Sequence, residues 1–109
     1  MSISIKELLS YALDSEASDL HLSVGNIPML RIHGEMKKIK TPELDLSTME
    51  KIRDEVLNSN QIKAFEDGLE IDFSTELEGK GRFRVNFFNQ INGLSAVFRT
   101  ISNVIKNSD

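Results

Sequence analysis

The spacing of apolar and polar positions divides the chain into helical and extended segments. Near the N-terminus, apolar residues recur three and four positions apart and form one helical face: Ile5, Leu8, Leu9, Ala12 and Leu13. Ser4 and Glu7 have the spacing of a capping box, and Ile3 and Leu8 have that of a hydrophobic staple. The pattern predicts a first helix that starts after Ser4 and ends between residues 14 and 16.

Two further helices are predicted in the middle of the chain. Ser47 and Glu50 repeat the capping-box spacing. An apolar helical face follows, made of Met49, Ile52, Val56 and Leu57. A short third helix over 61–67 is expected to stop at Gly68, because glycine readily adopts the left-handed conformation that ends helices.

The rest of the chain alternates with a period of two, which predicts strands. The segments are 19–24, then 29–39 with a tight turn at 33–35, and three strands in the last third of the chain. Turns are expected at the Glu-Gly-Lys-Gly stretch of 78–81 and at Asn92-Gly93. The order α-ββ-β-αα-βββ predicts an α+β domain with an antiparallel sheet of about six strands.

Several arginines fall on one face of this predicted sheet. If Asn92-Gly93 forms a two-residue turn, Asn86 lies opposite Arg99 and Arg84 lies diagonal to Arg99. Alternation then projects Arg82 from the same side as these three residues. Two guanidinium groups within diagonal reach repel each other, so a group of negative charge is expected between them.

The sequence leaves two interpretations of the arginines open. If the turn at 78–81 has an odd number of loop residues, Glu76 faces Arg84 and Glu78 faces Arg82 in a ladder of salt bridges. This register provides no obvious carboxylate for Arg99. The other interpretation is a bound phosphate, because the planar donor fork of arginine suits phosphate oxygens.

Composition and charge exclude several classes of function. The chain has 109 residues, a net charge of −4 and no cysteine. The acidic balance argues against nucleic-acid binding driven by phosphate neutralisation. The start of the chain does not have the pattern of a signal peptide. No Walker A motif occurs, and Gly79-Lys80-Gly81 belongs to a predicted hairpin, so the chain cannot cradle a triphosphate by itself.

Two other groups of residues carry weaker hypotheses. Asp19, His21 and His33 could hold zinc, but no fourth ligand is evident. We therefore expect a hydrogen-bonded surface pair and no tightly bound metal. Three apolar residues share the phase of the arginine face and suggest a partner surface: Phe88, Val97 and Ile101.

Two stretches carry a resemblance to a known family: ASDLHLSVGNIPMLRIHGEMKKI (17–39) and DFSTELEGKGRFRVNFFNQINGLSAVFRTI (72–101). The chain resembles the N-terminal domain of PilT-type ATPases, the type IV pilus retraction motors behind twitching motility, from Ile5 to Ile101. The helical start directly before Ala-Ser-Asp-Leu-His is more similar to retraction ATPases than to the longer assembly and secretion ATPases. The resemblance implies a PAS-like domain over 1–101, with 102–109 starting a linker to a missing RecA-like ATPase domain.

The resemblance also implies a place for the arginines. In this family the motor is a hexamer, and nucleotide lies between the two domains. The arginine of F-R-V-N, Arg84, and that of V-F-R-T, Arg99, would reach the phosphates, with Arg82 as a further candidate. ATP and Mg²⁺ are expected in the full-length protein, and no tightly bound cofactor is expected in this chain. The sequence departs from the family at Ser102, where a proline is usual.

Partners and location follow from the same resemblance. The expected partners are the RecA-like domains of its own and neighbouring subunits, in a homo-hexamer, and the inner-membrane machinery of the pilus. No nucleic acid is expected. The full-length protein would be cytoplasmic, at the inner-membrane base of the pilus, and the chain itself would be a fragment without ATPase activity. The alternative is a free-standing PAS-like ligand-binding or protein-interaction module, which the A-V-F-R-T-I run disfavours.

Overall fold

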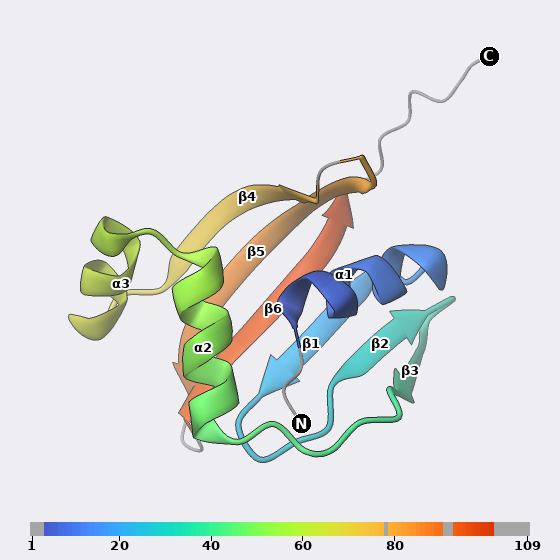
Figure 1. Cartoon of the computed structure of the whole chain (residues 1–109), viewed down its shortest axis with the longest axis horizontal. Coiled ribbons are helices and arrows are strands. Elements are labelled where there is room, and N and C mark those ends of the chain that lie inside the picture. Colours follow the sequence, from blue (N-terminus) through green and yellow to red (C-terminus); the bar gives the residue numbers. More distant parts are fainter. Residues whose placement is uncertain (1–3, 78, 91–92, 102–109) are drawn as a thin grey trace.

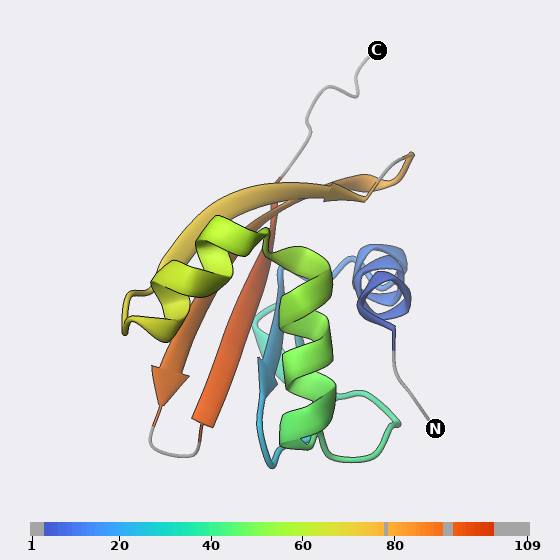
Figure 2. The ribbon, with the colours of Figure 1, turned by 60° about the vertical axis from the view of Figure 1, so that its left-hand side comes forward.

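One antiparallel sheet of six strands carries three helices on the same face (Figures 1 and 2). The computed structural model describes residues 4–77, 79–90 and 93–101. The elements, in chain order, are α1 (Ile5–Asp14), β1 (Asp19–Ser23), β2 (Met29–Ile32), β3 (Glu35–Lys38), α2 (Leu46–Val56), α3 (Ser59–Glu66), β4 (Ile71–Leu77), β5 (Gly81–Gln90) and β6 (Gly93–Ile101). The predicted α+β class and element order are confirmed.

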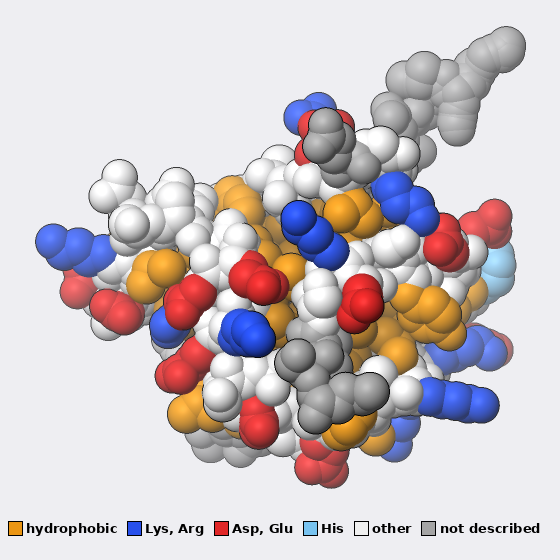
Figure 3. All heavy atoms as spheres, in the orientation of Figure 1, with side chains coloured by type: hydrophobic (Ala, Val, Ile, Leu, Met, Phe, Trp, Pro, Cys, Tyr) orange, Lys and Arg blue, Asp and Glu red, His pale blue; other side chains and the backbone are white. Residues whose placement is uncertain are grey.

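The order of strands in the sheet is β3-β2-β1-β6-β5-β4. Strands β1 and β6 are therefore neighbours in the centre of the sheet. Their pairing joins two three-stranded units, β1–β3 and β4–β6, into one layer. On the side that carries the helices, acidic and basic side chains are interspersed (Figure 3). Among the described residues, no helix is long and apolar enough to cross a membrane.

The core lies between the helices and the inward side of the central strands. Leu20, Phe98 and Val85 are neighbours across β1, β6 and β5, and all three are fully buried. Phe87 makes edge-to-face contacts with Phe65 of α3 and Phe98 of β6. The inward alternation that the sequence predicts for these strands is confirmed, so the opposite side chains of the strands point away from the helices.

The helix caps differ from the prediction in detail. Ser4 does cap α1, but its hydroxyl accepts the backbone N–H of Lys6 rather than that of Glu7. The cap of α2 is Asp45, whose extended backbone lets Oδ1 accept the N–H of Thr48 at 2.8 Å. The predicted cap, Ser47, lies inside the first turn of that helix. The predicted start of the third helix at 61 is also two residues late, because a reciprocal capping box joins Asn58 and Gln61.

Asp45→Ala is expected to lower the melting temperature by roughly 5 °C, because it leaves a helix donor without its acceptor. Ser47→Ala, two residues away on the same helix, is the matched control and should change it little. The pKa of Asp45 is lowered because its carboxylate accepts the Thr48 N–H. Its contribution is therefore present above about pH 4 and lost as the pH falls through the lowered pKa. Thermal scans of both variants at neutral and acidic pH test this, and equal melting temperatures at neutral pH would show that Asp45 is not the cap.

Both arginine hairpins have a register two residues away from the predicted one. In the β5–β6 hairpin Gln90 pairs with Gly93, so Arg84 faces Arg99 directly and Asn86 faces Val97. Gly93, with φ of +124°, belongs to the strand. The predicted turn position Asn92 lies outside the described residues.

In the β4–β5 hairpin Leu77 pairs with Gly81, so Glu76 faces Arg82 rather than Arg84. Gly81 belongs to the strand ladder, where an added Cβ would lie 3.2 Å from Leu13 of α1. The predicted pairing of Arg82 with Glu78 is therefore wrong, and Glu78 lies outside the described residues. The predicted odd loop length and the shared face of the arginines are confirmed.

Candidate functional site

A row of charged residues crosses the face of the sheet that carries no helix. Arg31 of β2 pairs with Asp19 of β1, Asp19 pairs with Arg99 of β6, and Arg99 pairs with Arg84 of β5. Each of these residues is next in sequence to a buried core residue of its own strand, so its side chain lies on the opposite side of the sheet. The sheet thus brings three arginines and one aspartate into a single line.

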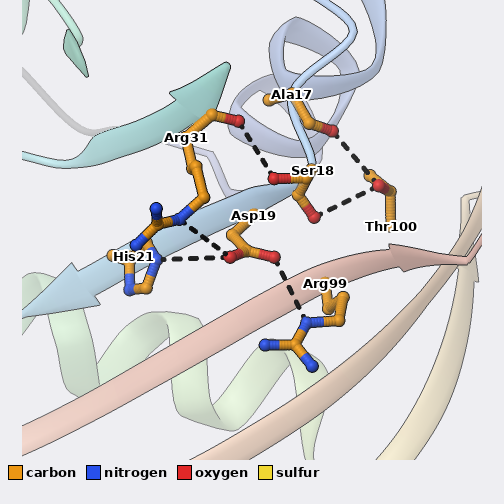
Figure 4. Close-up of polar contacts among 7 residues, drawn as sticks. All are labelled: Ala17, Ser18, Asp19, His21, Arg31, Arg99 and Thr100. Carbon is orange, nitrogen blue, oxygen red and sulfur yellow. Dashed lines mark hydrogen bonds and ion pairs between the residues drawn. The ribbon is translucent and has the colours of Figure 1, made fainter. Parts of the chain in front are cut away.

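Asp19 is the centre of this row (Figure 4). Its Oδ1 accepts a hydrogen bond from Arg99 Nε at 3.3 Å, and its Oδ2 lies 3.5 Å from Arg31 Nε. The same Oδ2 lies 3.7 Å from His21 Nε2, a buried atom without a hydrogen bond to any described residue. Only 10% of the Asp19 side chain is exposed. The expectation that Arg99 lacks a carboxylate partner is wrong.

Backbone contacts on both sides fix the position of Asp19. Ser18 donates from its backbone N–H to the Arg31 carbonyl at 2.8 Å. On the other side, the Thr100 N–H donates to the Ser18 carbonyl at 3.0 Å, and its hydroxyl donates to the Ala17 carbonyl at 3.1 Å. The start of β1 is thereby tied to both neighbouring strands (Figure 4), so the carboxylate of Asp19 is held between its two arginines.

Arg84 has a different acidic partner from the predicted Glu76. Its Nε donates to Asp72 Oδ1 at 3.3 Å and its Nη2 donates to Asp72 Oδ2 at 3.2 Å. The hydrogen bond to Asp72 raises the pKa of Arg84. Both side chains are at least half exposed. Asp72 is diagonal to Arg84, since Ser74 is the residue directly opposite.

A hollow of about 300 Å³ lies between the two arginines. Its lining residues come from β4, β5 and β6: Asp72, Arg84, Val85, Asn86, Val97 and Arg99. Within the described residues, Arg99 donates hydrogen bonds through Nε alone, and 70% of its side chain is exposed. The site therefore offers guanidinium donors to a ligand from solvent.

The other predicted site residues lie outside this hollow. Arg82 is exposed, faces Glu76 and Ile101, and forms no ion pair with any described residue. His33 lies in the β2–β3 turn with φ of +52°. In 4–77, 79–90 and 93–101, no group of three or more histidine and acidic side chains could hold a metal ion.

Comparison with known proteins relates this sequence and fold to one class of ATPase. No protein-family model matches the sequence. The chain is 47% identical over 97 residues, 89% of its length, to the type IV pilus retraction ATPase PilT of Pseudomonas aeruginosa. It is 44% identical over 78 residues, 72% of its length, to a twitching motility protein of Neisseria gonorrhoeae. The chain spans 28% and 21% of the lengths of these two relatives.

Solved structures agree with these relatives. The crystal structure of the pilus retraction motor PilT with bound ADP has a TM-score of 0.86 and 32% identity, over 97% of this chain and 31% of that one. The Legionella pneumophila ATPase DotB shares the fold, with a TM-score of 0.81 over 93% of this chain and 30% of that one, at 20% identity. The chain has a fold that forms part of both of these ATPases. Within that class, its sequence makes it an N-terminal domain of the PilT type.

Proposed function

We propose that residues 1–101 form the N-terminal domain of a hexameric ATPase motor that retracts type IV pili and drives twitching motility. Residues 102–109 would begin the linker to a RecA-like ATPase domain. The similarity to PilT over 89% of this chain supports the assignment, and the relative is several times longer than the chain. In the motor, this domain supplies arginines to the nucleotide phosphates in the cleft between the two domains.

The direct pairing of Arg84 with Arg99 is the observation that carries this role. Like charges directly opposite each other destabilise a sheet, so the arrangement favours a bridging anion. Asp19 and Asp72 neutralise part of this charge from two sides. Because both guanidinium groups remain mostly exposed, a ligand can still reach them.

Phosphate chemistry suits these two donors. A guanidinium group forms short, charge-assisted hydrogen bonds to phosphate oxygens, often in pairs. Such donors become more effective when charge develops on the transferred phosphoryl group. Arg84 and Arg99 would therefore stabilise the reacting phosphates and sense closure of the domains, with Arg82 as a further contact. ATP and Mg²⁺ would be bound mainly by the RecA-like domain, since this sequence has no Walker A motif.

Partners of the proposed motor follow from the same assignment. This domain would pack on the RecA-like domains of its own and neighbouring subunits in a homo-hexamer. The hexamer would act from the cytoplasm on the inner-membrane machinery of the pilus. The half-buried Phe88 and Val97, with the exposed Ile101, give the arginine face an apolar part for such packing.

The chain of 109 residues alone is expected to bind ATP weakly and to release no phosphate from it. The reason is that the Walker A loop and its lysine, which hold the triphosphate, do not occur in this sequence. A phosphate-release assay on purified chain, with Arg84→Ala as a second sample, measures this. ATP turnover that purifies with the chain and falls in the variant would contradict the proposal that hydrolysis requires the RecA-like domain.

A further inference from the structure

We propose that Asp72 is a displaceable counter-ion which occupies Arg84 until an anion enters the hollow, whereas Asp19 stays bound to Arg99. Binding of a phosphate group would then be an exchange of partners at Arg84 alone. The proposal rests on the phosphate-binding function above and adds a residue, Asp72, that sets how readily the phosphates bind.

Arg99 is held as a fixed donor. Its Nε is bound to Asp19, whose nearly buried carboxylate also has Arg31 and His21 beside it. A buried carboxylate that loses a charged partner is destabilised, so Asp19 retains Arg99 when an anion approaches. In Figure 4 the two terminal nitrogens of Arg99 lie away from Asp19, and they form no hydrogen bond to any residue that the structure describes, so a ligand can bind them.

Arg84 is held differently. Asp72 occupies both Nε and Nη2, which are two of the donors that a phosphate would need. The two contacts, at 3.3 and 3.2 Å, are longer than typical charge-assisted hydrogen bonds of about 2.7–2.9 Å. Because the pair is exposed, water and salt screen it. Arg84 can therefore exchange Asp72 for an anion with little loss of folding stability.

The competing carboxylate, that of Asp72, lines the same hollow as the two arginines. Asp72, Asn86 and Val97 form one row across β4, β5 and β6, and Arg84 and Arg99 form the next row. An anion between the two guanidinium groups would therefore lie beside Asp72 and be repelled by it. Release of Arg84 removes the ion pair and lets the carboxylate turn towards solvent. The amide of Asn86, which also lines the hollow, could donate a further hydrogen bond.

Titration of the chain with inorganic pyrophosphate, followed by NMR of the arginine Nε–H groups, tests the proposal. We expect saturable shifts of the Arg84 and Arg99 signals. Asp72→Asn should lower the apparent Kd by about two- to fivefold, the effect of removing one exposed competing ion pair. Glu76→Gln is the matched control, because Glu76 is an outward acid of the same strand that faces Arg82 instead. It should change the Kd clearly less than Asp72→Asn does.

The outcomes separate this proposal from the function on which it rests. If Arg99→Ala abolishes binding while Asp72→Asn leaves the Kd equal to that of the wild type, the hollow binds anions but Asp72 is not its counter-ion. If Asp72→Asn and Glu76→Gln have equal effects, only the overall charge matters and the proposal is wrong. Absence of saturable binding in all variants would also overturn it. The role of the arginines in the motor is then decided separately, by ATP turnover.

Discussion

Replacing Arg99 by alanine is expected to reduce ATP turnover of the complete motor at least about tenfold, which corresponds to about 1.4 kcal/mol of transition-state stabilisation. Hydrogen bonds to charged groups contribute about 1.5–3 kcal/mol, and donors aimed at developing charge can contribute more. Arg99 is fixed by Asp19, and its terminal nitrogens donate to no other described residue, so few rearrangements precede its contact with phosphate. The measurement is steady-state turnover of wild-type and variant motors with saturating ATP.

The matched control is Arg31→Ala, because Arg31 contacts the same carboxylate but does not line the hollow. Each variant should lower the stability of the domain by a similar amount, about 1–3 kcal/mol, because each removes one charged partner of the nearly buried Asp19 carboxylate. Of these two variants, only Arg99→Ala should lower turnover strongly. If Arg99→Ala stays within about twofold of wild type, which is about 0.4 kcal/mol, the arginines are only a surface salt-bridge network.

Arg84→Ala is expected to reduce turnover as well, with little change in melting temperature. Its partner Asp72 is half exposed and is solvated once the arginine is removed. If the melting temperature of this variant falls strongly together with its turnover, the pair has a structural role.

Replacing Phe87 by alanine is expected to lower the free energy of unfolding by about 3–5 kcal/mol, the usual range for a fully buried phenylalanine. Its ring is completely buried. The centre of the ring lies 6.3 Å from the ring centre of Phe65 and 6.1 Å from that of Phe98, in edge-to-face geometry. This loss is a large part of the roughly 5–15 kcal/mol that stabilises a domain. Denaturant unfolding followed by circular dichroism measures it.

The neighbouring Phe88 provides the control for Phe87. It projects from the opposite face of β5 and is only half-buried, so Phe88→Ala should cause a much smaller loss. Should Phe87→Ala fail to fold, Phe87→Leu keeps most of the apolar volume and allows the comparison. Equal losses for the two positions would mean that the arginine face is not the outer face of the sheet.

The faces of the strands could be predicted from the sequence, whereas their registers could not. Both hairpins are displaced by two residues, and because side chains alternate with a period of two, such a shift keeps every side chain on its predicted face. Arg84 and Arg99 were therefore placed on one face correctly but at the wrong distance. The turn-forming residues at 78–81 and 92–93 allow more than one loop, and packing of Gly81 against Leu13 is a tertiary contact that local patterns do not contain.

The partners of the arginines depend on contacts even farther apart in sequence. Asp19 precedes Arg99 by 80 residues and meets it because β1 lies beside β6 in the centre of the sheet. No hairpin signal predicts this adjacency. The contact of Asp72 with Arg84 depends on the register of β4 and β5, which the sequence does not determine. The resemblance in the F-R-V-N and V-F-R-T motifs points to Arg84 and Arg99 without these contacts, and their role at a phosphate stays a prediction.

A structure of the complete motor with Mg²⁺ and a non-hydrolysable ATP analogue tests the central claim most directly. The account predicts that guanidinium nitrogens of Arg84 and Arg99 lie within about 3.2 Å of phosphate oxygens, a normal hydrogen-bond distance. Arg99 should still contact Asp19, and Arg84 should have left Asp72. The account is contradicted if the domains are closed around the nucleotide while both arginines contact only their aspartates and no phosphate oxygen.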